Sequence, residues 1–269
     1  MCELFAMSSQ SPTRVSLSLE RLAARGAPGG SLADGWGVAC YDGRDVRLMR
    51  EPEPAGDGPW LKGALLAGRP NSRTVIAHIR HATQGGLSLA NTQPFARELG
   101  GRMHVFAHNG MLPGAERLFG QSIPRFRPVG ETDSEIAFCA LLDRLAPLWR
   151  GEPATVAKRH AEIRRFAKEL SALGPANFLY CDGEVLFAHG HRRKQADGGI
   201  AWPGLHLLTR RCAVDRDALA ASGVDVASPS GPQALALFAS VPLSDEAWKP
   251  LEEGDVVAAA AGELIAATM

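Results

Sequence analysis

The sequence predicts a mixed α+β fold built largely from antiparallel sheets. Apolar runs typical of buried strands occur at both ends of the 269-residue chain, and patterns typical of helices gather in its middle. Asp-Gly pairs at positions 42–43 and 182–183 lie between strand-like runs and indicate hairpin turns. No repeat, low-complexity block or linker interrupts the chain, so residues 1–269 are expected to form a single domain.

The first half of the chain alternates strands with loops. Residues 2–7 are mostly apolar and suit a buried strand. Residues 14–25 carry Val15, Leu19 and Leu22 at helical spacing and stop at Gly26, so a helix is expected there. Glycine-rich or proline-rich loops are expected over 27–33 and 52–59. Further strands are predicted at 35–41, 45–50, 74–79 and 103–107.

Two helices are expected in the middle of the chain and strands after them. Thr132 precedes Glu135 by three residues, which indicates a capping-box start for a helix that ends near Leu145. Residues 154–173 carry the apolar stripe of a second helix. After Gly174 the predicted strands are 177–181, 184–188, 205–209, 235–241 and 255–260.

The composition excludes several classes of protein. Lys+Arg (29) and Asp+Glu (29) cancel, so neither nucleic acid nor an anionic membrane is expected as a partner. The basic run Arg192-Arg193-Lys194 is interpreted as a solvated turn. There is no secretory signal and no window of roughly 18 apolar residues, so a cytoplasmic location is expected.

Metal and disulfide chemistry are not expected. The five cysteines are odd in number, widely spaced and without a CxxC pair, which indicates neither a disulfide framework nor a zinc site. His189 and His191 share one face of a predicted strand, but no third ligand joins them at a convincing spacing. They are interpreted as solvated residues at a strand end, and no cofactor is predicted.

Cys2 has an unusual position, directly after the initiator methionine. If Met1 is removed, one residue carries both a thiol and a free α-amine with a reference pKa of about 7.7–8.0. Such an amine can take the proton from its own thiol, directly or through a water, without a separate histidine. The alternative for an isolated Cys2 is a small buried hydrophobe in the first strand.

Asn109 and Gly110 follow a predicted strand whose last side chain is His108. An Asn amide and the following Gly N–H can both donate to the oxyanion of a tetrahedral intermediate. The alternative is an ordinary Asn-Gly turn. His108 itself is expected to be structural.

Arg80 and Asp133 offer complementary charges. A guanidinium at the end of a buried strand can bind a carboxylate through two parallel hydrogen bonds, although a structural ion pair is an equal alternative for Arg80. Asp133 lies in a first helical turn, where the helix dipole alone favours an acid. Together the two could hold the carboxylate and the ammonium of a free amino acid while a thiolate attacks its side-chain carbonyl.

These segments, in order, make the chain resemble the class II glutamine amidotransferases, most closely the YafJ-like group of predicted glutamine amidotransferases. The resemblance spans nearly the whole chain. It is carried by the start MCELFAMS and by DGWGVACY (34–41), AHIRHAT (77–83), NTQPF (91–95), AHNG (107–110), RPVGETDSE (127–135), LLTRR (207–211) and PLSDEAW (242–248).

The resemblance implies a fold and a role for each matched residue. The fold would be the four-layer αββα sandwich of the N-terminal-nucleophile hydrolases. Cys2 would form a γ-glutamyl thioester, and Asn109 with the Gly110 N–H would form the oxyanion hole. Arg80 would bind the α-carboxylate of glutamine and Asp133 its α-amino group, and Thr83 is a secondary candidate for substrate binding.

Three departures from the family pattern concern the substrate. His81 stands where larger synthases commonly have an aromatic residue, and Gln84 and Gln93 stand where histidine is usual.

Neither a P-loop nor a Rossmann glycine motif for a synthase half is present. The chain is therefore expected to hydrolyse its γ-glutamyl amide outright or to pass ammonia to a separate synthase or acceptor subunit. The alternatives are a γ-glutamyl hydrolase acting on a γ-glutamyl peptide or thiol metabolite, and a non-catalytic regulatory subunit with the same fold.

Overall fold

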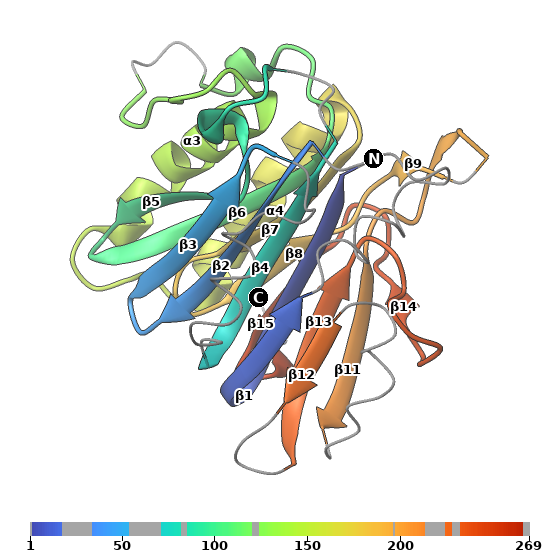
Figure 1. Cartoon of the computed structure of the whole chain (residues 1–269). Coiled ribbons are helices and arrows are strands. Elements are labelled where there is room, and N and C mark those ends of the chain that lie inside the picture. The colour runs from blue at the N-terminus through green and yellow to red at the C-terminus, as the bar shows by residue number, and fades with distance from the viewer. Residues whose placement is uncertain are drawn as a thin grey trace.

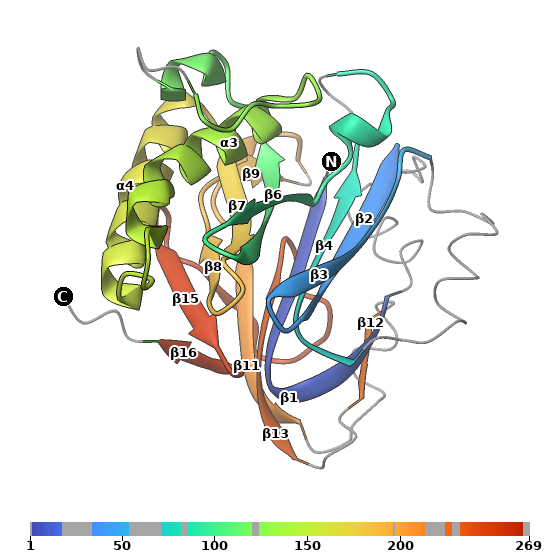
Figure 2. The same cartoon turned by 90° about the vertical axis from the view of Figure 1, so that its left-hand side faces the viewer.

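Two large antiparallel sheets lie face to face, and helices pack on the outer side of one of them (Figure 1 and Figure 2). The computed structural model describes residues 2–17, 34–53, 71–81, 85–119, 124–195, 197–212, 224–227 and 232–265. Within these ranges, no helix is both long and apolar enough to cross a bilayer. The two sheets and the helices beside them confirm the predicted α+β class with two largely antiparallel sheets.

The N-terminal strand lies at the centre of the larger, eight-stranded sheet. Strand β1 (Glu3–Leu17) pairs with β4 on one side and with β13 and β12 on the other. The remaining order along the sheet is β14 (Lys249–Pro250), β11 (His206–Cys212), β13 (Gln233–Ala239), β1, β4 (Asn71–Arg80), β2 (Gly35–Asp42) and β3 (Asp45–Glu51), with β12 (Val224–Ala227) beside β1.

The second sheet has six strands and comes from the later part of the chain. Its order is β16 (Glu263–Ile265), β15 (Val256–Ala260), β8 (Leu186–His189), β7 (Ala176–Cys181), β6 (Arg102–Gly110) and β5 (Phe95–Leu99). A separate two-stranded hairpin joins β9 (Arg193–Lys194) to β10 (Ile200–Ala201). Short 3-10 helices are η1 (Leu89–Asn91), η2 (Ala115–Phe119) and η3 (Ala146–Trp149).

Helices α3 (Asp133–Leu145) and α4 (Val156–Leu173) cover the outer face of the six-stranded sheet (Figure 2). The Thr132 hydroxyl accepts the Glu135 N–H at 3.2 Å, so the predicted N-cap of α3 is confirmed. The reciprocal half of the capping box is absent, because Glu135 instead accepts from the backbone N–H groups of Val129 (3.1 Å) and Gly130 (2.6 Å). Its carboxylate therefore fixes the loop that leads into the helix.

Alternation along β1 divides its side chains between two cores. Leu4 and Ala6 pack between the two sheets, and Phe5 and Met7 pack on the opposite face of the larger sheet. All four are at most 2% exposed, so this strand is buried on both faces. A third core joins the six-stranded sheet to α3 and α4. The ranges that the structure describes contain the helical layer on that side only.

The helix predicted at 14–25 is wrong over its first turn. Residues 14–17 continue β1, where Arg14 pairs with Asn71 of β4 and with Ala227 of β12. The spacing of apolar residues along 14–25 carries no information about such long-range pairing. Pairing overrides helix propensity once a strand has neighbours on both sides. Residues 18–25 lie outside the described ranges. The other predicted strands and both central helices are confirmed with shifts of a few residues, while β5, β9, β10, β12, β14 and β16 were not predicted.

Candidate active site

Polar residues from both sheets meet at the end of the sandwich where β1 begins. The pairing of Glu3 with Ile79 places Cys2 beside Arg80, the last residue of β4. Asn109 and Gly110 end β6 in the other sheet. The Asn109 Nδ2 donates a hydrogen bond of 2.6 Å to the Cys2 carbonyl oxygen, which joins the two sheets at this point. The fold thus brings together Cys2, Asn109 and Gly110, which are far apart in sequence.

The Cys2 thiol is held by the backbone of His81. The His81 N–H donates to Sγ at 3.2 Å, and the thiol donates to the His81 carbonyl at 3.4 Å. Burial raises the pKa of the Cys2 thiol, and the His81 N–H opposes that effect to a smaller extent. A thiol in this environment stays protonated at neutral pH, so a base must remove its proton when it attacks.

The Asn-Gly pair is held as the end of a strand, so the alternative of a turn at this position is wrong. Asn177, opposite Asn109 in register on β7, donates from Nδ2 to the Asn109 carbonyl at 3.0 Å and to the Arg192 carbonyl at 2.7 Å. A Cβ added to Gly110 would lie 1.9 Å from the Pro175 carbonyl oxygen, so the strand can pass here only with glycine.

His108 lies in the interior, in agreement with the structural role expected for it. Its Nδ1 is 2.9 Å from the Ser134 hydroxyl at the start of α3. The Gln93 side chain binds its backbone on both sides: Oε1 accepts the His108 N–H at 2.6 Å, and Nε2 donates to the His108 carbonyl at 3.1 Å. The departure from the family pattern at Gln93 therefore concerns the support of β6.

The two residues proposed for charge recognition are held by backbone groups. Arg80 is buried, and its Nη2 donates to the carbonyl oxygens of Gly85 and Gly86, both at 3.2 Å. The Asp133 carboxylate accepts the Leu112 N–H at 2.7 Å and the Ser134 hydroxyl at 3.2 Å. Both side chains are thus fixed in place. Thr83 and Gln84 lie outside the described residues.

A cavity of about 260 Å³ opens beside Cys2. Neither Arg80 nor Asp133 contributes to its wall. Part of the wall comes from the β9–β10 hairpin and the residues that lead into it, and these residues were not predicted to belong to the site. The lining residues are Cys2, His81, Asn109, Gly110, Met111, Pro175, Arg192, Arg193, Lys194 and Ile200.

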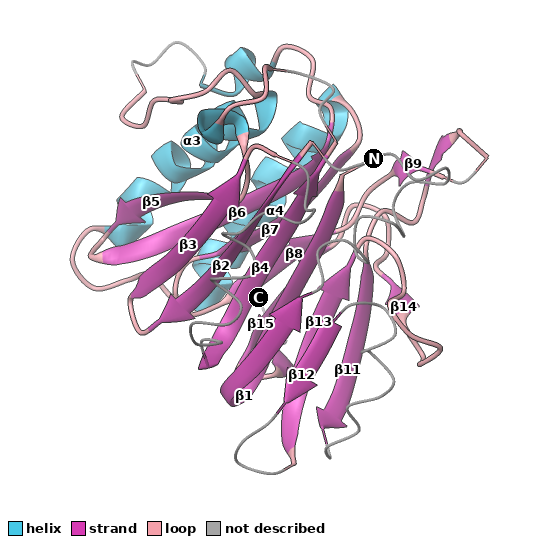
Figure 3. Ribbon diagram, in the orientation of Figure 1, coloured by secondary structure: helices cyan, strands magenta, loops and turns pink. Residues whose placement is uncertain are grey.

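The interpretation of the basic run Arg192–Lys194 as a solvated turn is wrong for its middle residue, Arg193. Arg192 and Lys194 are exposed, but Arg193 is only 6% exposed and its Nη2 lies 2.6 Å from the Glu3 carboxylate. Its Nη1 also donates to the Ser240 carbonyl at 2.7 Å. Burial raises the pKa of Glu3, and the charge of Arg193 opposes that rise. A buried ion pair therefore ties the hairpin to Glu3, the residue after Cys2 (Figure 3 shows β9 beside the N-terminus).

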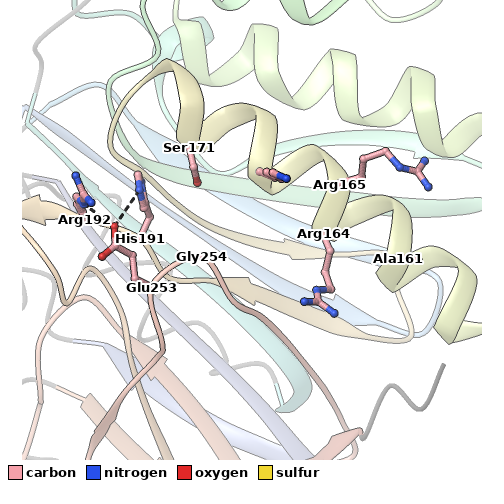
Figure 4. A pocket seen from close by; sticks show the side chains of 9 residues that line it. Ala161, Arg164, Arg165, Ser171, His191, Arg192, Glu253 and Gly254 are labelled. Atoms are coloured by element: carbon pink, nitrogen blue, oxygen red, sulfur yellow. Dashed lines mark hydrogen bonds and ion pairs between the residues drawn. The ribbon is translucent and has the colours of Figure 1, made fainter.

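A larger cavity of about 780 Å³ lies between α4 and the segments around His191 and Glu253 (Figure 4). The Glu253 carboxylate contacts Arg192 Nε at 2.5 Å and His191 Nε2 at 3.5 Å. The described residues that line this larger cavity include no cysteine, so it offers no thiol for a reaction. His189 is fully buried, which corrects its interpretation as solvated, and its Nδ1 binds the Asp255 carbonyl at 2.9 Å. Among the described residues, no group of three His, Cys, Asp or Glu side chains is placed to hold a metal.

Solved structures that are named as glutamine amidotransferases share this fold. The structure matches a crystal structure of a predicted glutamine amidotransferase from Pseudomonas aeruginosa with a TM-score of 0.76 and 35% identity, over 98% of this chain and all of that one. It also matches the fold of Bacillus subtilis glutamine phosphoribosylpyrophosphate amidotransferase, with a TM-score of 0.59, 16% identity and coverage of 98% of this chain and 48% of that one.

The sequence comparisons define the family. The model of class II glutamine amidotransferases matches residues 1–269. YafJ of Escherichia coli K12, provisionally named a glutamine amidotransferase, is 36% identical over 95% of this chain and 96% of its own length. A similarly named Haemophilus influenzae protein is 32% identical over 99% of this chain and 86% of its own. The chain belongs to the class II glutamine amidotransferases.

Proposed function

We propose that the chain hydrolyses a γ-glutamyl amide, with glutamine as the reference substrate, through a thioester on Cys2. Membership of the family supports glutamine amide hydrolysis in general. The observation that carries the specific assignment is the contact of 2.6 Å between Asn109 Nδ2 and the Cys2 carbonyl. It places a side-chain amide donor at the same residue as the thiol.

The proposed chemistry begins with removal of Met1, which gives Cys2 a free α-amine. That amine takes the thiol proton as Sγ attacks the γ-carbonyl carbon. Asn109 Nδ2 carries two hydrogens, and the Cys2 carbonyl uses one of them. The second, with the Gly110 N–H, would stabilise the oxyanion. The carbon–nitrogen bond then breaks, ammonia leaves with the transferred proton, and water hydrolyses the thioester to glutamate.

Arg80 and Asp133 are proposed to bind the α-carboxylate and the α-ammonium of the substrate. Their support by backbone groups favours this role, because charged groups that are already fixed lose little freedom when a ligand binds. The resting contacts of Arg80 with Gly85 and Gly86 use Nη2. A guanidinium has five N–H donors in a planar fork, which suits a carboxylate.

The test combines intact mass, labelling and turnover. Mass spectrometry should show loss of Met1, and a glutamine-mimicking electrophile should label Cys2 alone. Burial raises the pKa of Cys40 to about 11 and of Cys139 to about 12, which makes both poor nucleophiles and suitable internal controls. Cys2→Ala should abolish glutamate release, while Cys40→Ala should retain it.

Two results would contradict the proposal. Retention of Met1 on the mature chain would remove the amine base and favour a non-catalytic subunit. Undiminished turnover by Cys2→Ala would remove the thioester from the mechanism altogether.

A further inference from the structure

We propose that the cavity beside Cys2 is a leaving-group subsite selecting γ-glutamyl compounds whose leaving amine carries a carboxylate. The inference rests on the proposed function, since it takes Cys2 as the acyl acceptor and Arg80 and Asp133 as the groups that hold the glutamyl end. It adds a substrate class and assigns the basic run Arg192–Lys194 a role in binding.

The position of the cavity sets which part of a substrate it can receive. Cys2, Asn109 and Gly110 line it, so it opens directly onto the reacting atoms. Arg80 and Asp133 are absent from its wall and are directed to the backbone of residues 85–86 and 112. Because those two residues are assigned to the glutamyl end, we assign the cavity to the leaving group, which lies on the other side of the scissile bond in such a substrate.

The size and the apolar lining exceed what ammonia requires. A molecule as small as water or ammonia occupies roughly 30 Å³ in a liquid. The cavity of about 260 Å³ therefore has room for an amino-acid-sized group, and Met111, Pro175 and Ile200 give it apolar surface. Ile200 is 57% exposed and Met111 43% exposed, so an occupant would cover side chains that otherwise face solvent.

The charge of the wall is positive. Among the residues that the structure describes, three cationic ones line the cavity and no carboxylate does. Arg192 is paired with Glu253, and Arg193 with Glu3. Lys194 is exposed and forms no ion pair with any residue of the described ranges, so its ammonium is the cation best placed to receive an anionic ligand.

The wall is built in advance of binding. The Glu3–Arg193 pair and the Asn177 bond to the Arg192 carbonyl fix the entry to the hairpin. The Gln195 side chain donates to the Ala201 carbonyl at 2.7 Å across the hairpin, and Trp202 Nε1 donates to the Leu251 carbonyl at 2.7 Å beyond it. The hairpin projects near the N-terminus in Figure 1. An ordered cationic wall favours a ligand of defined geometry.

The bonds formed and broken, and the proton transferred, are the same as in the hydrolysis proposed above. Sγ forms the bond to the γ-carbonyl carbon, the carbon–nitrogen bond breaks, and the leaving amine takes the proton from the thiol. The amine is an α-amino acid or the N-terminus of a peptide instead of ammonia. Water then releases glutamate, so no further reactant is needed.

A pair of substrates tests this inference with the full-length, Met1-processed chain. γ-Glutamyl-alanine and γ-glutamyl-ethylamide differ by the carboxylate of the leaving group, and glutamine serves as the reference. The carboxylate should raise kcat/KM about tenfold, as expected for one charge-assisted contact. Lys194→Met, which keeps the aliphatic stem, should remove most of that preference. Lys158→Met changes an exposed lysine on α4 outside the cavity and should preserve it.

The outcomes separate this inference from the function on which it rests. Turnover of glutamine with labelling of Cys2, but no preference for γ-glutamyl-alanine over the ethylamide, would overturn the subsite and leave the proposed function standing. A preference that Lys194→Met retains in full would overturn the cationic wall as its source. Absence of both labelling and turnover would overturn the two proposals together.

Discussion

Replacing Arg193 with Met should cost about 3–5 kcal/mol of unfolding free energy, because it leaves the Glu3 carboxylate buried without its cation. Glu3 is 2% exposed and Arg193 6% exposed, so solvent cannot reach the stranded charge without local opening. The variant also loses the bond from Arg193 to the Ser240 carbonyl. Methionine keeps most of the aliphatic stem, so lost packing contributes little.

Urea unfolding of the wild type, Arg193→Met, Glu3→Gln and the double variant gives the coupling energy of the pair. The double variant should be more stable than the sum of the single effects predicts, by more than about 1 kcal/mol, because it removes both charges. The cost of Arg193→Met should also decrease as the pH falls. Burial raises the pKa of Glu3 in the folded state, and Arg193 opposes that rise. Without Arg193 the folded variant takes up the proton more readily than the folded wild type, so it gains more stability on acidification.

The exposed pair Arg47–Asp42, at 3.0 Å and with side chains 66% and 68% exposed, is the matched control. Arg47→Met should cost about 0–1 kcal/mol. If Arg193→Met costs no more than this control, or if the four stabilities are additive, the buried pair does not anchor the hairpin.

Three further outcomes are expected. Asn109→Ala should lower kcat about 10²–10³-fold while mass spectrometry still detects iodoacetamide on Cys2; unchanged kcat would exclude Asn109 from the oxyanion hole. Thr132→Ala should cost about 1 kcal/mol in a thermal melt through loss of the α3 cap, and no shift would show that the cap is dispensable. Below pH 6.5 the chain should lose stability by about 1.4 kcal/mol per pH unit for each histidine that is buried and neutral in the folded state. These histidines are His78, His104 and His189, whose pKa values burial lowers to about 3 or 4, so the extra protons bind to the unfolded chain. A urea midpoint that is equal at pH 7 and pH 5 would contradict this expectation.

The sequence predicted the elements whose signal is local. The Thr132 cap, the apolar stripe of α4 and the Asp-Gly hairpins each lie within one short window, and each is present in the structure. The extension of β1 to Leu17 depends on pairing with residues 71 and 227, which no window of the sequence contains.

The candidate site shows the same difference between residues with a local signal and residues whose role depends on long-range contacts. Cys2, Asn109 and Gly110 could be proposed because their chemistry is visible in their types and their neighbours. Arg193 could not, because three basic residues in a row look alike in sequence although only the middle one is buried. One signal was available: Glu3 is a charged residue within an apolar first strand, and such a residue needs a buried partner. The sequence alone does not say which arginine supplies it.

Gln93 has a consequence for how the strand carrying Asn109 responds to its surroundings. Its amide offers one acceptor and two donors, and it satisfies both backbone groups of His108 at once. A neutral imidazole in that place could also donate and accept, but acid would turn its acceptor into a second donor and repel the His108 N–H. Carboxamides do not titrate, so the clamp on β6 has the same polarity in an acidified compartment as at neutrality. A loss of turnover under mild acid should therefore originate in protonation of the N-terminal amine, with the two hydrogen bonds between Gln93 and His108 intact.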